Sequence, residues 1–299
     1  SSSPTPVTSP GLMERQGIEI VAESERTAKP SDLFWPWFAA NISVFGMGYG
    51  SYILGFGVSF WQATLVTLIG IPISFFLCGL IAIAGKRGSA PTMVLSRAAF
   101  GVHGQKVPGI VSGLTSIGWE TFLSIMAVLA TATVFSRLGL PSGTPVLVAA
   151  TVAVAALIVV ASVLGYHTIM KLQSVLTWIT GAITILYVIL TFSHIDLNTV
   201  LAVPNGSPQQ VIGALVMVMT GFGLGWINIA ADWSRYQKRE TSDGAIILWN
   251  TLGGAIAPVL LVFFGVLLVA SDPSLSSGIA NDPIGTLASI LPIWVLIPF

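Results

Sequence analysis

The chain has 299 residues, of which 54% are hydrophobic and 8% are charged, and 12 basic residues balance 12 acidic ones. A soluble domain carries roughly a quarter charged residues, so this composition excludes a water-soluble globule and indicates a polytopic membrane protein. The charge balance gives no indication of a nucleic-acid partner. A single cysteine, Cys78, excludes a disulfide scaffold.

The N-terminal segment differs in composition from the rest of the chain. Residues 1–31 are rich in Ser, Pro and Glu and contain no short apolar segment followed by a cleavage site. This composition is typical of a disordered tail and not of a signal peptide. We therefore expect a disordered cytoplasmic tail over residues 1–31 and a transmembrane transporter domain over residues 32–299.

The remaining sequence is divided into long apolar runs, each near the length of about 20 residues that a membrane-spanning helix needs. Residues 33–85 carry no charge and are long enough for two spans, with a turn at Gly-Phe-Gly 55–57. In chain order the runs predict spans at 34–57, 61–84, 107–135, 144–165, 169–192, 211–231 and 245–270. An eighth span is expected to start near Thr286 and to be cut at Phe299, so we expect a fragment that lacks C-terminal helices.

The basic residues are distributed unevenly between the loops. If the tail is cytoplasmic, its three basic residues lie inside, together with eight basic residues of alternate loops. Of the 12 basic residues, 11 are then cytoplasmic, and only Arg137 lies outside. Cytoplasmic loops are enriched in Lys and Arg. This distribution predicts a multi-pass protein of the cell membrane with a cytoplasmic N-terminus.

A five-residue pattern, Phe-Gly-x-Gly-aromatic, occurs at residues 45–49 of the first predicted span and at 222–226 of the sixth. An interval of five helices means that the second copy enters the membrane from the opposite side, as in transporters built from inverted repeats. We expect one repeat over about residues 34–192 and an incomplete second repeat over about 211–299.

The glycines of this pattern predict a break in each helix. Glycine costs about 1 kcal/mol relative to alanine in a helix interior, and unwound backbone inside a membrane is tolerated where it lines a cavity. The alternative is that these small residues allow close packing of intact helices.

Glu120 is the only acidic residue inside a predicted span. An ionisable group at such a depth is costly and indicates function. Ser112, Ser116 and Ser124 share its helix face at four-residue spacing, so this face is expected to line a cavity. The alternative is a protonated glutamate that is hydrogen-bonded to a neighbouring helix.

Motifs of enzymes and metal sites are missing from the sequence. The three histidines share no ligand spacing, and no nucleophile elbow, zinc helix or dinucleotide fingerprint is present. We therefore expect neither an enzyme nor a cofactor.

Three segments carry a family resemblance: Trp-Phe-Ala-Ala-Asn-Ile-Ser at 37–43, Trp-Glu-Thr at 119–121, and residues 221–236 with their Ala-Asp-Trp-Ser-Arg-Tyr ending. They resemble the purine-cytosine permease branch of the nucleobase:cation symporter family. The resemblance implies an all-α, LeuT-like fold of five plus five inverted helices, with seven helices and the start of an eighth present. It also implies cation-coupled uptake of nucleobases such as cytosine and purines by alternating access.

The same resemblance implies the site residues. The substrate would be bound by Ser43, Ser116, Trp119, Glu120, Gly221, Phe222 and Gly223. Backbone carbonyls of Ala39 and Ile42 would bind a sodium ion whose other ligands lie beyond Phe299.

Two positions bear on the choice of substrate. Ser116 and Glu120 stand where relatives that take hydantoins or uracil have tryptophan and glutamine. A carboxylate accepts a hydrogen bond from the exocyclic amine of cytosine, adenine or guanine, and uracil has no such amine. Glu120 also offers a proton acceptor, so the coupling ion is expected to be a proton or sodium.

Other functions stay open at this point. A transporter of the same fold for allantoin, thiamine-like compounds or amino acids is one alternative, and a channel or receptor is another. The expected partners are a small-molecule nucleobase and the lipid bilayer, and the oligomeric state stays undetermined.

Overall fold

The first seven apolar runs of the sequence form helices, two of which are interrupted. The computed structural model describes residues 20–292, without the side chains of Glu25, Tyr166, His167, Met170 and Gln173. Five long helices match the second to fifth and the seventh predicted spans: α3 (Phe60–Gly88), α6 (Lys106–Arg137), α7 (Thr144–Leu164), α8 (Tyr166–Thr191) and α12 (Asp243–Ser271). The predicted all-α class is confirmed, because the described residues contain no β-structure except one isolated bridge between Ala28 and Gln237.

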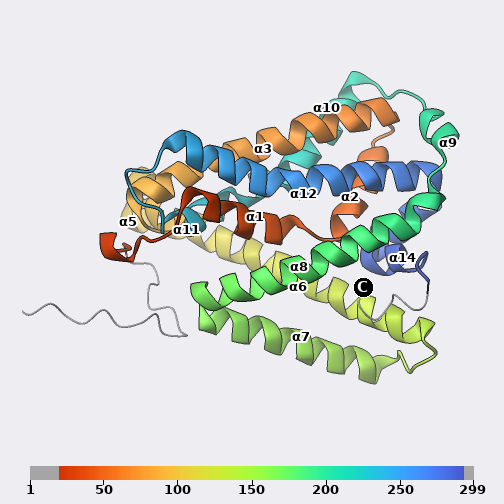
Figure 1. Cartoon of the computed structure of the whole chain (residues 1–299), viewed down its shortest axis with the longest axis horizontal. Coiled ribbons are helices and arrows are strands. Elements are labelled where there is room, and N and C mark those ends of the chain that lie inside the picture. Colours follow the sequence, from red (N-terminus) through yellow and green to blue (C-terminus); the bar gives the residue numbers. More distant parts are fainter. Residues whose placement is uncertain (1–19, 293–299) are drawn as a thin grey trace, which may run out of the picture.

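The first and sixth predicted spans are interrupted. The first consists of α1 (Phe34–Asn41) and α2 (Phe45–Leu54), and the sixth consists of α10 (Pro208–Gly221), the 3-10 helix η4 (Gly223–Ile229) and α11 (Ala230–Ser234). The two broken spans run in opposite directions (Figure 1), as the inverted repeat predicts.

Short elements connect the spans. They are η1 (Glu23–Glu25), η2 (Pro30–Leu33), α4 (Thr92–Leu95), α5 (Arg97–Gly104), η3 (Phe192–His194), α9 (Leu197–Leu201), α13 (Leu275–Asn281) and α14 (Pro283–Ala288). Thr286 lies within α14, a helix of six residues, and residues 293–299 lie outside the described part. The expected eighth span is therefore not described.

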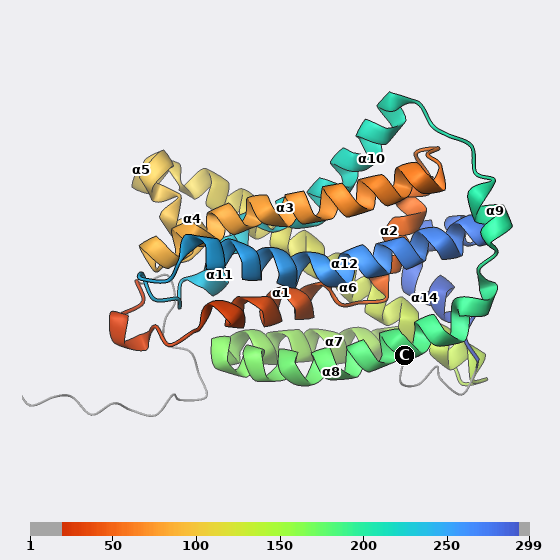
Figure 2. The same ribbon diagram turned by 45° about the horizontal axis from the view of Figure 1, so that its top comes forward.

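The long helices form two groups. Helix α12 packs against α3, α2 and α1, whereas α7 and α8 lie together on one side of these helices (Figures 1 and 2) and α6 packs against α7. No residue of α7 is buried, and its large exposed side chains are apolar, as expected for a helix that faces lipid.

Glycines bring α2 and α12 into direct backbone contact. A Cβ on Gly50 would overlap the backbone of α12 at Gly265, and a Cβ on Gly265 would overlap the backbone of α2 at Met47. Close packing through small residues, which was the alternative interpretation, therefore applies to Gly50, which follows the repeated pattern in the first span. For Gly46 and Gly48, within the pattern, a Cβ would come no closer than 3.4 Å to a neighbouring side chain.

The segment before α1 is packed against the bundle. The Val21 amide donates to the Ser89 carbonyl at 2.9 Å, and the Gln237 side-chain amide donates to the Lys29 carbonyl at 2.8 Å. Val21 is fully buried. The structure therefore differs from the expected tail in residues 20–31, because Val21 and Lys29 are hydrogen-bonded to Ser89 and Gln237. Residues 1–19 lie outside the described part.

The two ends of the bundle differ in charge. Lys86 and Arg87 at the end of α3 both pair with Asp243 at the start of α12. At the opposite end, the Arg137 guanidinium donates to the Ala288 carbonyl at 2.8 Å. Successive spans cross the bundle in alternate directions, so the loops that carry Arg97 and Lys106, and Arg235 to Arg239, lie at the same end as Lys86. This agrees with the predicted charge distribution.

The glycine contact predicts a stability effect. We expect Gly50→Ala to destabilise the protein by about 1–3 kcal/mol, because the new methyl group has to displace the α12 backbone. Thermal unfolding of the purified protein in detergent measures this change. Gly181→Ala is the matched control, since its Cβ would lie 3.5 Å from the Ile42 side chain, an ordinary contact. An equal loss in both variants would contradict the prediction.

Candidate functional site

The first helix break lies at residues 42–44. Ile42 has an extended backbone (φ −83°, ψ 96°), and the Ser43 hydroxyl accepts a hydrogen bond from the Phe45 amide at 3.2 Å. The Asn41 side-chain amide donates to the Trp37 carbonyl at 2.8 Å and holds the last turn of α1. The break therefore precedes the glycines of the repeated pattern, which lie inside α2.

The second break lies at Phe222, whose φ of −108° and ψ of −113° end the α-helix. The chain continues as a 3-10 helix in which the Gly225 amide donates to the Phe222 carbonyl at 3.0 Å. Here the break coincides with the repeated pattern, as the glycines predict.

A cavity of about 310 Å³ lies between the two breaks and α6. Six residues of the expected site line it together: Ser43, Ser116, Trp119, Glu120, Gly221 and Phe222. Segments that are far apart in the sequence thus meet at one cavity, as expected for the interface of two inverted repeats.

Three expected residues lie elsewhere. The Gly223 amide donates to the Ser74 hydroxyl at 3.0 Å, so the structure gives this amide a protein partner, and Gly223 is buried outside the cavity lining. Ala39 and Ile42 do not line the cavity either. Among the described residues, no backbone hydrogen bond outside the regular helices uses the carbonyl of Ala39 or Ile42.

Glu120 is the acidic group of the cavity. It is exposed to the cavity, and the part of the chain described here contains no hydrogen-bond or ion-pair partner for its carboxylate. The alternative of a glutamate bonded to a neighbouring helix therefore has no support within residues 20–292. An unpaired carboxylate of this kind can accept hydrogen bonds from a ligand.

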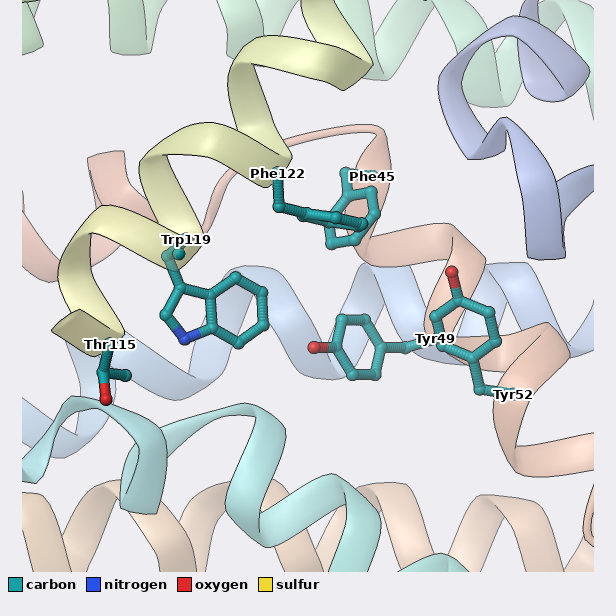
Figure 3. Close-up of a pocket in the computed structure, with 7 residues that line it drawn as sticks. Phe45, Tyr49, Tyr52, Thr115, Trp119 and Phe122 are labelled. Carbon is teal, nitrogen blue, oxygen red and sulfur yellow. The ribbon is translucent and has the colours of Figure 1, made fainter. Parts of the chain in front are cut away.

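Aromatic rings form the wall next to Glu120. Tyr49 packs on Phe222 with 4.5 Å between ring centroids and 46° between ring planes. Phe122 makes edge contacts with Phe45 at 5.6 Å and Trp119 at 5.9 Å. Rings of α2 and α6 also line an adjoining open hollow of about 400 Å³ (Figure 3), so Tyr49 and Trp119 contribute apolar ring surface to both spaces.

Several cavity residues were not expected from the sequence. Tyr49 and Trp226, which end the two copies of the repeated pattern, both line the cavity, so the repeat itself carried the signal. Asn228 of η4 also lines the cavity. Its side-chain amide donates to the Ser112 hydroxyl at 2.7 Å and joins η4 to α6.

The fold and this site define a class of protein: a multi-pass membrane protein of the inverted-repeat type, with a cavity between two interrupted helices. The model of the family described as permease for cytosine/purines, uracil, thiamine, allantoin matches residues 20–299. The chain belongs to this nucleobase:cation symporter family, whose members are permeases and not enzymes.

Individual relatives agree with this assignment. A Bacillus subtilis (strain 168) protein named provisionally as a purine-cytosine permease is 23% identical over 95% of this chain and 61% of its own length. A purine-cytosine permease of Emericella nidulans is 28% identical over 87% of this chain and 50% of its own length. The chain thus spans between half and about three fifths of these relatives.

A solved structure supports the fold. The nucleobase-cation-symport-1 family transporter MHP1, in a closed conformation with bromovinylhydantoin bound, matches with a TM-score of 0.73 and 19% identity. The match covers 96% of this chain and 66% of that one. The LeuT-like fold expected from the sequence is thereby confirmed.

The aromatic wall predicts the effect of removing Tyr49. We expect Tyr49→Ala to lower the free energy of unfolding by about 3 kcal/mol, because the Phe222 ring loses its packing partner. We expect Tyr49→Phe to stay within about 1 kcal/mol of the unaltered protein, since the ring is kept. Thermal unfolding of both variants checks this, and equal losses would assign the effect to the hydroxyl.

Proposed function

We propose that the protein is a secondary active transporter that takes up nucleobases such as cytosine and purines together with a cation. The observation that carries this proposal is the unpaired carboxylate of Glu120 in an aromatic-lined cavity between two helix breaks. A nucleobase is planar and carries ring N–H and amine donors, and this cavity offers surfaces and acceptors of the matching kinds.

The proposed binding mode assigns one role to each group. The base stacks on Phe222 and Trp119, and stacking of this kind contributes about 1–3 kcal/mol per base. Glu120 accepts hydrogen bonds from the amine edge. The hydroxyls of Ser43 and Ser116 orient the ring. Gly221 leaves room beside Tyr49, because a Cβ at this position would lie 2.8 Å from the tyrosine ring.

The coupling cation has two candidate positions. The carbonyls of Ala39 and Ile42 lie at the first break and are of the oxygen type that sodium binds. Glu120 is the candidate proton carrier. In either case the cation drives transport if it binds one conformation better than the other and so shifts the alternating-access equilibrium.

The proposed orientation places the N-terminus and the end that holds Lys86 and Arg87 in the cytoplasm of the cell. This choice rests on the positive-inside rule. The substrate then enters from the opposite end, where Arg137 contacts Ala288.

The role of Glu120 can be tested in the full-length protein. We expect Glu120→Gln to raise the KM for labelled cytosine by roughly thirtyfold, because a hydrogen bond to a charged group contributes about 2 kcal/mol. Uptake assays over a range of pH measure this, and the pH dependence should flatten if Glu120 carries the proton. Ser124→Ala is the control, since Ser124 lies one turn further along α6 and outside both cavities. Unchanged uptake in Glu120→Gln would show that the carboxylate is not the base-reading group.

Cation coupling can be tested separately with the unaltered protein. We expect cytosine or adenine to accumulate against its gradient, and accumulation to fall when sodium is replaced by choline or when the proton gradient is collapsed. A channel cannot concentrate a neutral solute, so accumulation excludes that alternative. Uptake of allantoin, a thiamine-like compound or an amino acid in place of both bases would contradict the proposal.

A further inference from the structure

The unwound part of the sixth span is attached to α3 by one buried side chain. Ser74 is fully buried in the middle of α3. Its hydroxyl accepts a hydrogen bond from the Gly223 amide at 3.0 Å and donates one to the Ile71 carbonyl at 2.8 Å. Both hydrogen-bonding functions of the hydroxyl are therefore used, and neither is directed at the cavity.

The contact around Ser74 leaves no space for another partner. A Cβ on Gly223 would overlap the backbone of α3 at Ser74 and Phe75, so η4 and α3 meet backbone to backbone. The Gly223 amide is the first after the break at Phe222, where the α-helix ends. An unpaired N–H at a buried position is costly, and the Ser74 oxygen removes that cost.

The same turn of α3 is also fixed to a third helix. The side-chain amide of Asn250, a fully buried residue of α12, donates to the Phe75 carbonyl at 3.2 Å. The position of Gly223 is therefore determined by α3 and α12 together. Its neighbours Gly221 and Phe222 line the cavity, so their placement depends on this attachment.

We infer that Ser74 is a positioning residue of the substrate site, which fixes the second helix break through the Gly223 amide. It does not touch the substrate. It acts by holding Phe222 against Tyr49 in the geometry that leaves the cavity open between the two breaks. This role rests on the proposed function where it is tested by cytosine transport.

The two breaks differ in how they are held. At the first break, the hydroxyl that accepts the amide comes from Ser43, within the break itself. At the second, it comes from another helix. The geometry of the second break therefore depends on the position of α3. Removing the Ser74 hydroxyl should make the second break more mobile and leave the first break unchanged.

The test compares Ser74→Ala with a matched loss of a hydroxyl in the same helix. We expect Ser74→Ala to raise the KM for cytosine in the full-length protein about tenfold, with the maximal rate per molecule within about twofold, because fewer molecules hold the binding geometry. Thr67→Val is the control: Thr67 is fully buried in α3, and its hydroxyl donates only to the Ala63 carbonyl of the same helix.

Hydrogen exchange gives a second measurement that needs no substrate. The Gly223 amide should exchange slowly in the unaltered protein, although it lies just beyond the end of an α-helix. Its exchange should be faster in Ser74→Ala and unchanged in Thr67→Val.

Three outcomes would each overturn the inference: a wild-type KM in Ser74→Ala, an equal KM change in Thr67→Val, or fast exchange of the Gly223 amide in the unaltered protein. If Ser74→Ala does not fold, the exchange rate in the unaltered protein still decides. If the unaltered protein transports neither cytosine nor adenine, the proposed function fails, whereas the exchange data still report whether Ser74 fixes the break.

Discussion

The structure depends on one constraint: backbone N–H and C=O groups inside the hydrocarbon need partners within the protein, because no water is available there. A site built from unwound helix conflicts with this constraint at two places. The chain resolves the conflict with one serine hydroxyl at each break, Ser43 for the Phe45 amide and Ser74 for the Gly223 amide. Each hydroxyl accepts a hydrogen bond from one backbone amide that the interruption of the helix leaves without a helical acceptor.

Close packing brings the two breaks to the same cavity. Gly50 and Gly265 allow α2 and α12 to meet at their backbones, and Gly223 allows the same between η4 and α3. Small residues therefore set the distance between the broken helices and the two helices that support them. Residues of larger volume at these positions would separate the two halves of the site, because protein interiors tolerate overpacking poorly.

Helix α6 completes the site although few of its own residues are buried. Two hydrogen bonds hold it, one from Asn228 to Ser112 and one from Arg137 to the Ala288 carbonyl. They lie on either side of Glu120 along the helix, so the face that carries this carboxylate is directed at the cavity. In the proposed binding mode, the base therefore meets one carboxylate of α6 and the aromatic rings of α6 and of the second break.

The sequence by itself determined the spans and their order, because the hydrocarbon layer requires apolar runs of a fixed length. It determined the inverted repeat through the two copies of the Phe-Gly-x-Gly-aromatic pattern, which are five helices apart. It also identified Glu120, since a carboxylate within an apolar span is exceptional. Only the tertiary structure decided where the first break falls, which glycines serve packing, and that Gly223 donates to Ser74. These features depend on contacts between helices that are distant in the chain, such as α3 with η4, and local sequence patterns do not encode which hydroxyl will meet which unpaired amide.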